Sequence, residues 1–252
     1  GVAARAKCRS RRHFSLCYSG RLSSYKNVYR EQPQLYDALV RAEDTDDNIR
    51  QTLLEVCTLE GATIVEAGAG TGRLTRLMLE AGAARIIATE IEPAMLAIAQ
   101  KSLAHYAGKL ECLVADARQL PAQDAIADVA IAGWVFGHFR SWMPDNWQSE
   151  VGAAVSHLER VTRPGGTVIV IETLGTGTES PAPAEGLLEY YKWLEEERGF
   201  ARTAIRTDYL FESVAEAERI TGAFFGNDFA AKVREQQWRR VPECTGVWTR
   251  TV

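Results

Sequence analysis

The sequence predicts an α/β fold built on a mostly parallel sheet, and three observations support this prediction. First, residues 63–79 change hydrophobic period, because a short β-branched run precedes three glycines and apolar residues then recur at helical spacing. Second, further apolar runs of strand length lie at residues 85–90, 110–114, 128–133 and 167–172. Third, 252 residues, 46% of them hydrophobic and 25% charged, are enough for one sizeable domain.

The three glycines, Gly68, Gly70 and Gly72, lie where the first strand turns into its helix. Without β-carbons the backbone can adopt unusual dihedrals and a ligand can approach it closely. A dinucleotide fingerprint G-x-G-x-x-G would need a glycine at position 73, where Arg73 stands. The pattern is instead an acid at the strand end, Glu66, followed by glycines at alternate positions. A nucleotide site and a plain structural turn remain alternatives on this pattern alone.

This pattern resembles motif I of the class I S-adenosylmethionine (SAM) dependent methyltransferases. The resemblance implies that the loop of Ala67, Gly68, Gly70 and Gly72 passes under the methionine part of SAM, and that Glu66 holds the ammonium group of SAM, directly or through water. A carboxylate at this place would repel a pyrophosphate but favour a cation. The resemblance also implies a Rossmann-like, doubly wound seven-stranded sheet, mostly parallel with an antiparallel last strand, with helices on both faces.

Two more acids follow strands in positions that suit an adenosine group. Glu90 lies 18 residues past Gly72, near the ~20-residue offset at which an acid of dinucleotide folds binds a ribose. In the resembled family this acid takes both ribose hydroxyls, and the next apolar residue, here Ile91, packs on the adenine. The resemblance assigns Asp116 to the adenine amino group and the neighbouring main chain, at Ala117, to a ring nitrogen. The alternatives are a solvated Glu90 and an Asp116 that caps a turn.

The end of the fourth strand is expected to face the transferable methyl group, because open parallel sheets bind ligands beyond the carboxyl ends of their strands. Gly133 and Trp134 lie there, and His138 is the histidine placed for chemistry, either as a general base or as a group that shapes the substrate site. Glu172 ends the fifth strand and Tyr36 precedes the core. Both are further catalytic candidates, with a hydrogen-bonded acid and a core aromatic as the alternatives.

The predicted organisation is a basic arm at residues 1–34, expected to be poorly ordered, and a methyltransferase domain at residues 35–252. Within this domain the core spans residues 59–178, and residues 179–252 supply a lid and closing strands. Residues 1–30 hold eight Lys or Arg and no acid, which leaves 21 basic and 33 acidic residues in the remainder. The arm could be without a role, a targeting segment, or a contact for anionic partners.

Several local features are predicted as well. A helix is expected to begin after Thr45–Asp47 as N-cap and to end at Gly61, and Phe200–Phe211 is expected to be one strand. No apolar run approaches the ~18 residues that a membrane helix needs. Five scattered cysteines without a CxxC pair suggest reduced thiols and a cytoplasmic location, and no metal site is expected.

Together these features predict transfer of the methyl group of SAM to an O, N or C nucleophile of a small organic molecule by in-line displacement, mainly through positioning. The segment Ala132–Val135 lacks the Asp/Asn-Pro-Pro-aromatic motif of enzymes that methylate base or glutamine nitrogens. We therefore do not expect nucleic acid as the acceptor, and the oligomeric state stays open. A non-catalytic SAM-binding module, an RNA methyltransferase that uses the basic arm, and a nucleotide-dependent oxidoreductase are the alternatives.

Overall fold

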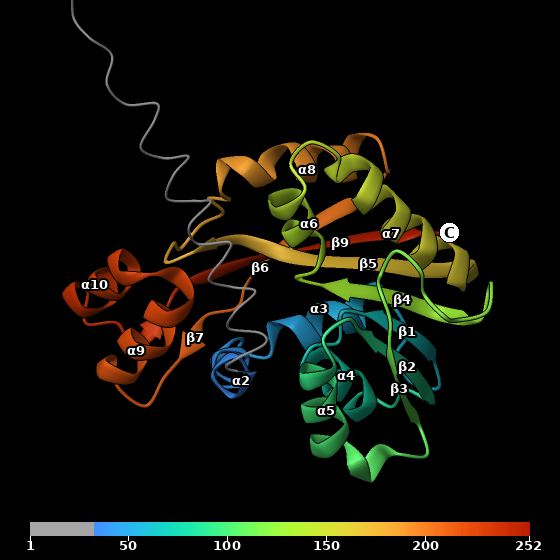
Figure 1. Ribbon diagram of the computed structural model, residues 1–252, viewed down its shortest axis with the longest axis horizontal. Coiled ribbons are helices and arrows are strands. Elements are labelled where there is room, and N and C mark those ends of the chain that lie inside the picture. Colours follow the sequence, from blue (N-terminus) through green and yellow to red (C-terminus); the bar gives the residue numbers. More distant parts are fainter. Residues whose placement is uncertain (1–32) are drawn as a thin grey trace, which may run out of the picture.

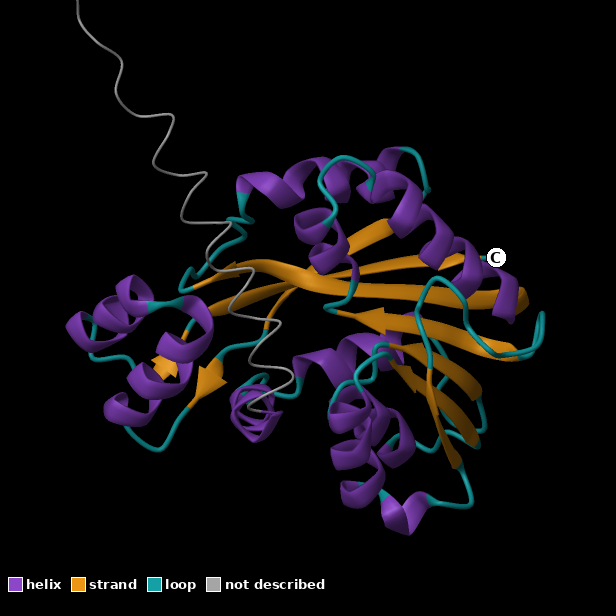
Figure 2. Cartoon of the chain, viewed as in Figure 1, coloured by secondary structure: helices purple, strands orange, loops and turns teal. Residues whose placement is uncertain are grey.

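The computed structural model describes residues 33–252, which form a seven-stranded sheet with helices on both faces and a smaller group of elements at one end (Figures 1 and 2). The strands of the large sheet are β1 Thr63–Ala67, β2 Arg85–Glu90, β3 Leu110–Val114, β4 Ala127–Gly133, β5 Thr162–Thr176, β6 Ala201–Arg206 and β9 Glu243–Thr251. Their order across the sheet is β3-β2-β1-β4-β5-β9-β6. The predicted fold class is confirmed.

The five strands from β3 to β5 run parallel, and β9 lies antiparallel between β5 and β6. The predicted antiparallel last strand is therefore confirmed as β9. The strand order reverses between β1 and β4, which are hydrogen-bonded neighbours. Such a reversal leaves a crevice beyond the carboxyl ends of the strands, and ligands of open α/β sheets bind there.

Helices cover both faces of the sheet, because its central strands are apolar on both sides. Ile64 and Ile131 belong to the apolar cluster beneath α3 and α4, whereas the adjacent Val65 and Ala130 belong to the cluster beneath α7 and α8. Figure 1 shows α3, α4 and α5 on one side and α6, α7 and α8 on the other. The bounds of these helices are α3 Asn48–Val56, α4 Arg73–Glu80, α5 Pro93–Ser102, α6 Phe136–Trp142, α7 Trp147–Val161 and α8 Glu185–Glu196, with a 3₁₀ turn at Ala104–Tyr106.

A third apolar cluster joins the start of the described chain to its C-terminal part (Figure 1). It combines helices α2 Pro33–Ala42, α9 Val214–Phe225 and α10 Asn227–Glu235 with a two-stranded sheet of β7 Tyr209–Leu210 and β8 Arg240–Val241. Leu39, Phe224 and Val241 are buried in it. This group, called the α9 group below, lies at the end of the sheet where β5 and β9 project, and it closes one side of the cavities described below.

The predicted single strand Phe200–Phe211 is wrong, because pairing with β9 ends at Arg206 and the chain then bends into β7. Asp208 holds the bend, since it accepts hydrogen bonds from Arg206 Nε at 2.9 Å and Arg240 Nε at 2.8 Å. The carboxylate of Asp208 thus joins the end of β6 to β8, two segments that no local sequence pattern connects.

The predicted start of the helix after Thr45–Asp47 is confirmed, because α3 begins at Asn48, but its predicted end at Gly61 is wrong. Asp47 precedes α3 in a left-handed conformation without capping it, whereas the carboxylate of Asp44 accepts the N–H groups of the first two helix residues, each at 2.9 Å. Helix α3 ends before Cys57, which is extended, so Gly61 belongs to the turn before β1 rather than to a helix cap.

No helix within residues 33–252 is long and apolar enough to cross a membrane. The basic arm predicted for residues 1–34 lies outside the described residues except for its last two, which begin α2.

Candidate active site

The glycine turn between β1 and α4 requires glycine at Gly68, for a reason that the structure makes explicit. Gly68 has φ of 73°, in the left-handed region, and a β-carbon added to it would lie 2.3 Å from Cγ2 of Val135. The turn therefore packs directly against the segment that follows β4. Gly70 and Gly72 also have positive φ, but a β-carbon on Gly72 would meet Ala99 of α5 at 3.0 Å, so Gly72 serves helix packing.

A first cavity of about 440 Å³ opens beside this turn. Among the described residues, its walls come from the glycine turn, the ends of β2, β3 and β4, helix α6 and Tyr36. The predicted cofactor residues that line it are Gly68, Gly70, Glu90, Ile91, Asp116, Ala117, Gly133 and Trp134. Of the remaining predicted cofactor residues, Ala67 is fully buried in the core and Glu66 lies on the wall of a second cavity.

Glu90 ties the end of β2 to the glycine turn. One carboxylate oxygen accepts the N–H of Gly70 at 2.9 Å and the other accepts the N–H of Glu92 at 3.0 Å. Burial raises the pKa of Glu90, and these backbone bonds partly offset that rise. Each oxygen keeps a lone pair for a further donor. Beside it, 57% of the surface of Ile91 is exposed, which leaves an apolar surface for a flat ring at the rim of the cavity.

Asp116 lines the first cavity but is engaged by Arg118, which donates to it from the main chain at 2.8 Å and from Nε at 2.9 Å. These bonds hold the pKa of Asp116 below its usual value. Arg118 also reaches Glu150 of α7 at 2.5 Å. Asp116 is thus an ionised carboxylate fixed in place at the end of β3, and it can accept a further donor from a ligand.

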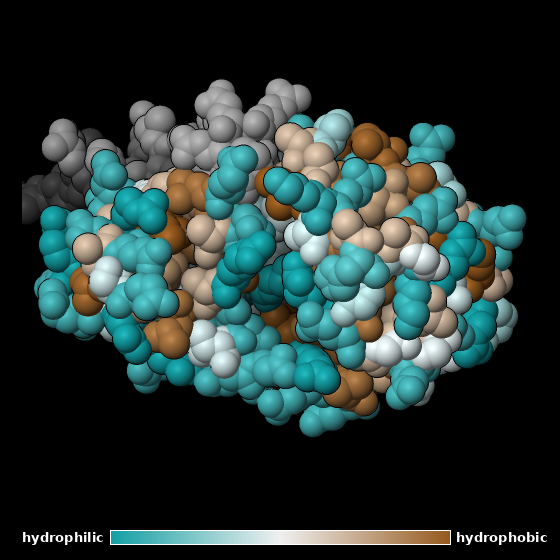
Figure 3. Space-filling model, turned by 90° about the horizontal axis from the view of Figure 1, so that it is seen from below, coloured by the Kyte–Doolittle hydropathy of each residue, from teal (hydrophilic) through white to brown (hydrophobic). Residues whose placement is uncertain are grey.

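A second cavity of about 240 Å³ lies on the other side of the same wall. Five residues line both cavities: Tyr36, Gly68, Gly133, Trp134 and His138. The second cavity extends from this shared wall toward α2, the end of β5 and the α9 group. Seen from below in Figure 3, the surface is hollowed between these parts of the molecule, and hydrophilic side chains gather around the hollow. The two cavities could therefore hold two different molecules in contact.

Trp134 forms part of the shared wall in an unusual backbone conformation. Its φ is 55°, and its N–H donates to the carbonyl of Ile171 at 2.7 Å. Its ring lies 4.5 Å from the guanidinium of Arg73, a cation–π contact. A non-glycine residue with positive φ at a cavity wall is a common mark of a functional site.

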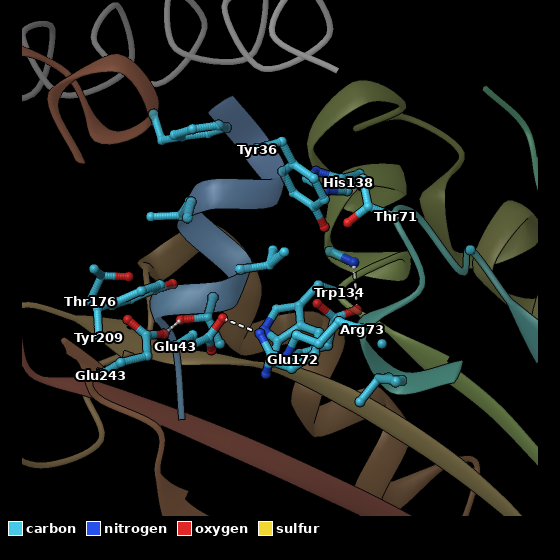
Figure 4. A pocket seen from close by; sticks show the side chains of 18 of the residues that line it. Tyr36, Glu43, Thr71, Arg73, Trp134, His138, Glu172, Thr176, Tyr209 and Glu243 are labelled. Atoms are coloured by element: carbon cyan, nitrogen blue, oxygen red, sulfur yellow. Dashed lines mark hydrogen bonds and ion pairs between the residues drawn. The ribbon is translucent and has the colours of Figure 1, made fainter. Parts of the chain in front are cut away.

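The catalytic candidates His138 and Tyr36 both lie at this wall (Figure 4). The ring of His138 stacks on Trp142, with centroids 4.9 Å apart and planes 12° from parallel. Tyr36 lies over the glycine turn, since its ring would be 3.6 Å from a β-carbon on Gly70. Burial raises the pKa of the Tyr36 hydroxyl, so this group is a hydrogen-bond donor rather than a base at neutral pH.

Glu172, the third candidate, lines the second cavity and also supports α6, a helix that sequence reasoning did not predict. Its Oε1 atom accepts the N–H groups of Phe136 and Gly137, each at 2.9 Å. Burial raises the pKa of Glu172 to about 7, although these hydrogen bonds lower it. Glu172 thereby stabilises the start of α6, the helix that contains His138.

Comparisons with known proteins agree with this geometry. Residues 65–170 match a family described as methyltransferase domain. This segment is a class I SAM-dependent methyltransferase domain. The match covers the glycine turn, Glu90, Asp116 and the wall between the cavities except for Tyr36. The cofactor of the domain is SAM.

Two curated relatives and one solved structure define how far the likeness goes. The chain is 36% identical over 119 residues to a malonyl-[acyl-carrier protein] O-methyltransferase of Serratia marcescens. The aligned residues make up 47% of this chain and 40% of that protein. It is 49% identical over 59 residues to the ribosomal RNA small subunit methyltransferase A of Rhodopseudomonas palustris, 23% and 21% of the two chains. A SAM dependent methyltransferase from Aquifex aeolicus has the same fold with a TM-score of 0.51 at 15% identity, covering 93% of this chain and 98% of that one.

The chain thus spans less than half the length of these curated relatives. The names of these relatives give two different acceptors, malonyl-[acyl-carrier protein] and ribosomal RNA. Their match therefore does not identify the acceptor of this methyltransferase domain.

SAM fits the residues present. Glu66 at the end of β1 is buried, and its Oε2 atom accepts the hydroxyl of Thr75 at 2.6 Å. Burial raises its pKa to about 7. A nearby cation such as the ammonium group of SAM stabilises the ionised form of a buried carboxylate, because it compensates for the solvation that burial removed.

Sequence reasoning missed one group of polar residues in the second cavity. Arg73 donates from Nη1 to Glu43 Oε2 at 2.5 Å, and Glu243 of β9 and Tyr209 of β7 line the same end (Figure 4). Arg73 follows the glycine loop directly, which is a signal that could have been used. Glu43 and Glu243 come from opposite ends of the chain, so no local pattern links them.

Proposed function

We propose that this chain transfers the methyl group of SAM to a small organic molecule that occupies the second cavity. The observation that carries the proposal is the wall that the two cavities share at Gly68, Gly133, Trp134, Tyr36 and His138. A methyl donor in one cavity and a nucleophile in the other would meet at this wall. Methyl transfer needs such in-line contact and the exclusion of water more than it needs reactive side chains.

The first cavity would hold the adenosine part of SAM. Glu90 would accept the ribose hydroxyls, Ile91 would cover the adenine, and Asp116 with the main chain at Ala117 would bind its polar edge. The turn at Gly68 and Gly70 would pass under the methionine part, with the carboxylate of Glu66 near the ammonium group. The positions of these residues around one cavity, with Glu66 just beyond Gly68, support this assignment.

When bound, SAM supplies a methyl group activated by a positively charged sulfur. The chain would then orient the acceptor and accept a proton where the nucleophile carries one. His138 is at the shared wall and is the best placed base. Glu172, with its pKa of about 7, would chiefly position α6 and could take the proton onward. Tyr36 would hold the acceptor by hydrogen bonding.

The match to ribosomal RNA methyltransferases makes RNA a second candidate acceptor. Two features of the described residues disfavour it. The second cavity is lined by four glutamates and one arginine, and residues 33–252 carry 21 basic and 32 acidic residues. Such a surface repels phosphates instead of attracting them. A small acceptor agrees better with these charges, and we propose that it is methylated in the cytoplasm.

The test is acceptor-dependent formation of S-adenosylhomocysteine (SAH). The purified chain would be incubated with SAM and either a library of small amines, alcohols, acids and phenols or ribosomal RNA, and SAH would be measured by mass spectrometry. We expect SAH to form with one class of small molecule. SAH formed only with RNA would favour the second candidate, whereas SAM binding without turnover on any acceptor would indicate a non-catalytic SAM-binding module.

A further inference from the structure

The part of the second cavity near the start of β9 contains polar atoms that the described residues leave unsatisfied. Glu43 Oε1, Arg73 Nη2 and Glu243 Oε2 are buried and have no hydrogen-bond partner among the described residues. The side chain of Glu43 is 5% exposed and Glu243 is 1% exposed. Buried polar atoms in native proteins are nearly always paired, so three open ones in one cavity call for a partner that residues 33–252 do not supply.

The charges at this end are unbalanced. Arg73 is already neutralised by its ion pair with Glu43 and lies over the ring of Trp134. Among residues 33–252 Glu243 has no ion-pair partner, and its other oxygen accepts the hydroxyl of Thr173 at 2.6 Å. The acids that line the whole cavity are Glu43, Glu66, Glu172 and Glu243, against one arginine. A cation would therefore be favoured at Glu43 and Glu243, and an anion would not.

The unsatisfied acids lie away from the site of methyl transfer. Figure 4 shows Glu43, Glu243 and Tyr209 together at one end of the cavity and Tyr36 and His138 at the other. Glu43 and Glu243 line the second cavity only, whereas Tyr36 and His138 line both. Arg73 lies between Glu43 and Trp134 of the shared wall, so a group bound by these acids is separated from that wall by Arg73.

Resting on the proposed function, we propose that the acceptor is a small aliphatic ammonium compound, whose protonated amine binds between Glu43 Oε1 and Glu243 Oε2 while its nucleophile, several bonds away, faces the shared wall. The ammonium group donates to the two open carboxylate oxygens. The open Nη2 of Arg73 donates to a neutral oxygen of the acceptor or to a water held beside it. The amine is a recognition group in this arrangement and is not itself methylated.

The protonation of Glu243 provides a readout that is independent of turnover. Burial raises the pKa of Glu243 to about 8, and the nearby acids Glu43 and Asp208 add to this rise. The hydrogen bond from Thr173 lowers the pKa. Tyr209 faces the same acids. An ammonium group favours the ionised carboxylate, so its binding releases a proton, and its affinity rises as pH increases from about 6 to 8.

The experiment is calorimetry on the SAH-bound protein with three matched probe series of three to six carbons: amino alcohols, diols and hydroxy acids. We expect the best amino alcohol to bind at least roughly tenfold more tightly than its diol, because hydrogen bonds to charged groups are the strong ones. Its heat of binding should vary with the ionisation enthalpy of the buffer at pH 7, which reports proton release.

The variant Glu243→Gln should reduce the preference for the amino alcohol to less than about threefold and abolish the proton release. The same substitution at Glu80, an exposed residue of α4, should change neither, and thermal melting would show that both variants fold. SAH binding is measured first and without probes, so loss of SAH binding would count against the proposed function alone.

Three results would overturn the proposal while SAH still binds. They are equal binding of the amino alcohol and the diol, tighter binding of the hydroxy acid through Arg73, and no binding of any amino alcohol up to about 10 mM. A preference that survives Glu243→Gln would also overturn it.

Discussion

Replacement of Gly68 by alanine tests whether the glycine turn has the close packing that the cofactor site requires. The new β-carbon would lie 2.3 Å from Cγ2 of Val135 and 3.5 Å from its Cβ. Val135 is β-branched and its side chain cannot easily rotate away. Either the turn or the segment after β4 must therefore move, and both form the shared wall of the two cavities.

The expected cost has two parts. An alanine in the left-handed region costs roughly 1–2 kcal/mol, and overpacking of a filled site costs about 1–3 kcal/mol more. Gly61 is a matched control, because its φ of 74° is nearly the same as that of Gly68 but no atom of the described residues lies within 4 Å of an added β-carbon. Gly61→Ala should therefore show the first part only.

Urea unfolding of both variants, combined with calorimetric titration of SAH, would separate the two parts. We expect Gly68→Ala to lose about 1–3 kcal/mol more unfolding free energy than Gly61→Ala, or, if the turn moves instead, to bind SAH at least about tenfold more weakly. Equal stability of the two variants together with unchanged SAH affinity would refute the reasoning.

Two further predictions concern groups at the cavities. Because burial raises the pKa of Glu66 to about 7 from an ordinary 4.5, the folded state holds its proton more tightly than the unfolded state. The contribution of Glu66 to the free energy of unfolding, roughly 3 kcal/mol, is fully present below pH 4.5 and is lost as pH rises to about 7. Urea unfolding without cofactor should show that Glu66→Gln removes this part of the pH dependence, and an identical pH dependence in the variant would contradict the assigned burial. His138→Ala should lower kcat by about 10²–10⁴ if His138 is the base, whereas His105→Ala on the exposed surface should not. A loss below about threefold would leave His138 a positioning role only.

The parts of the site that sequence reasoning predicted are those built from consecutive residues. The switch from strand to helical period located β1, the glycine turn and α4, and the acids at strand ends located Glu90 and Asp116 at one cavity. Parallel strands bring their carboxyl ends to one edge of the sheet, so these residues had to converge once the strands were identified.

The parts that it missed depend on contacts between distant segments. Glu43, Arg73 and Glu243 line one cavity because Glu43 pairs with Tyr209 of β7 and bonds to Arg73 after the glycine turn, while Glu243 begins β9. Helix α6 is short, and its first N–H groups are bonded by Glu172 from the neighbouring strand β5 and not by a local cap. The bend at Asp208 likewise depends on Arg240, 32 residues away.

The most direct test of the central claim is calorimetric titration of SAH into the purified chain, with NAD as the parallel control. We predict saturable binding of SAH in roughly the micromolar range and none of NAD. Glu90→Ala, which removes the carboxylate beside Gly70 at the first cavity, should abolish the binding of SAH. Absence of SAH binding to the folded chain, or equal binding to Glu90→Ala, would contradict the assignment of the first cavity to SAM.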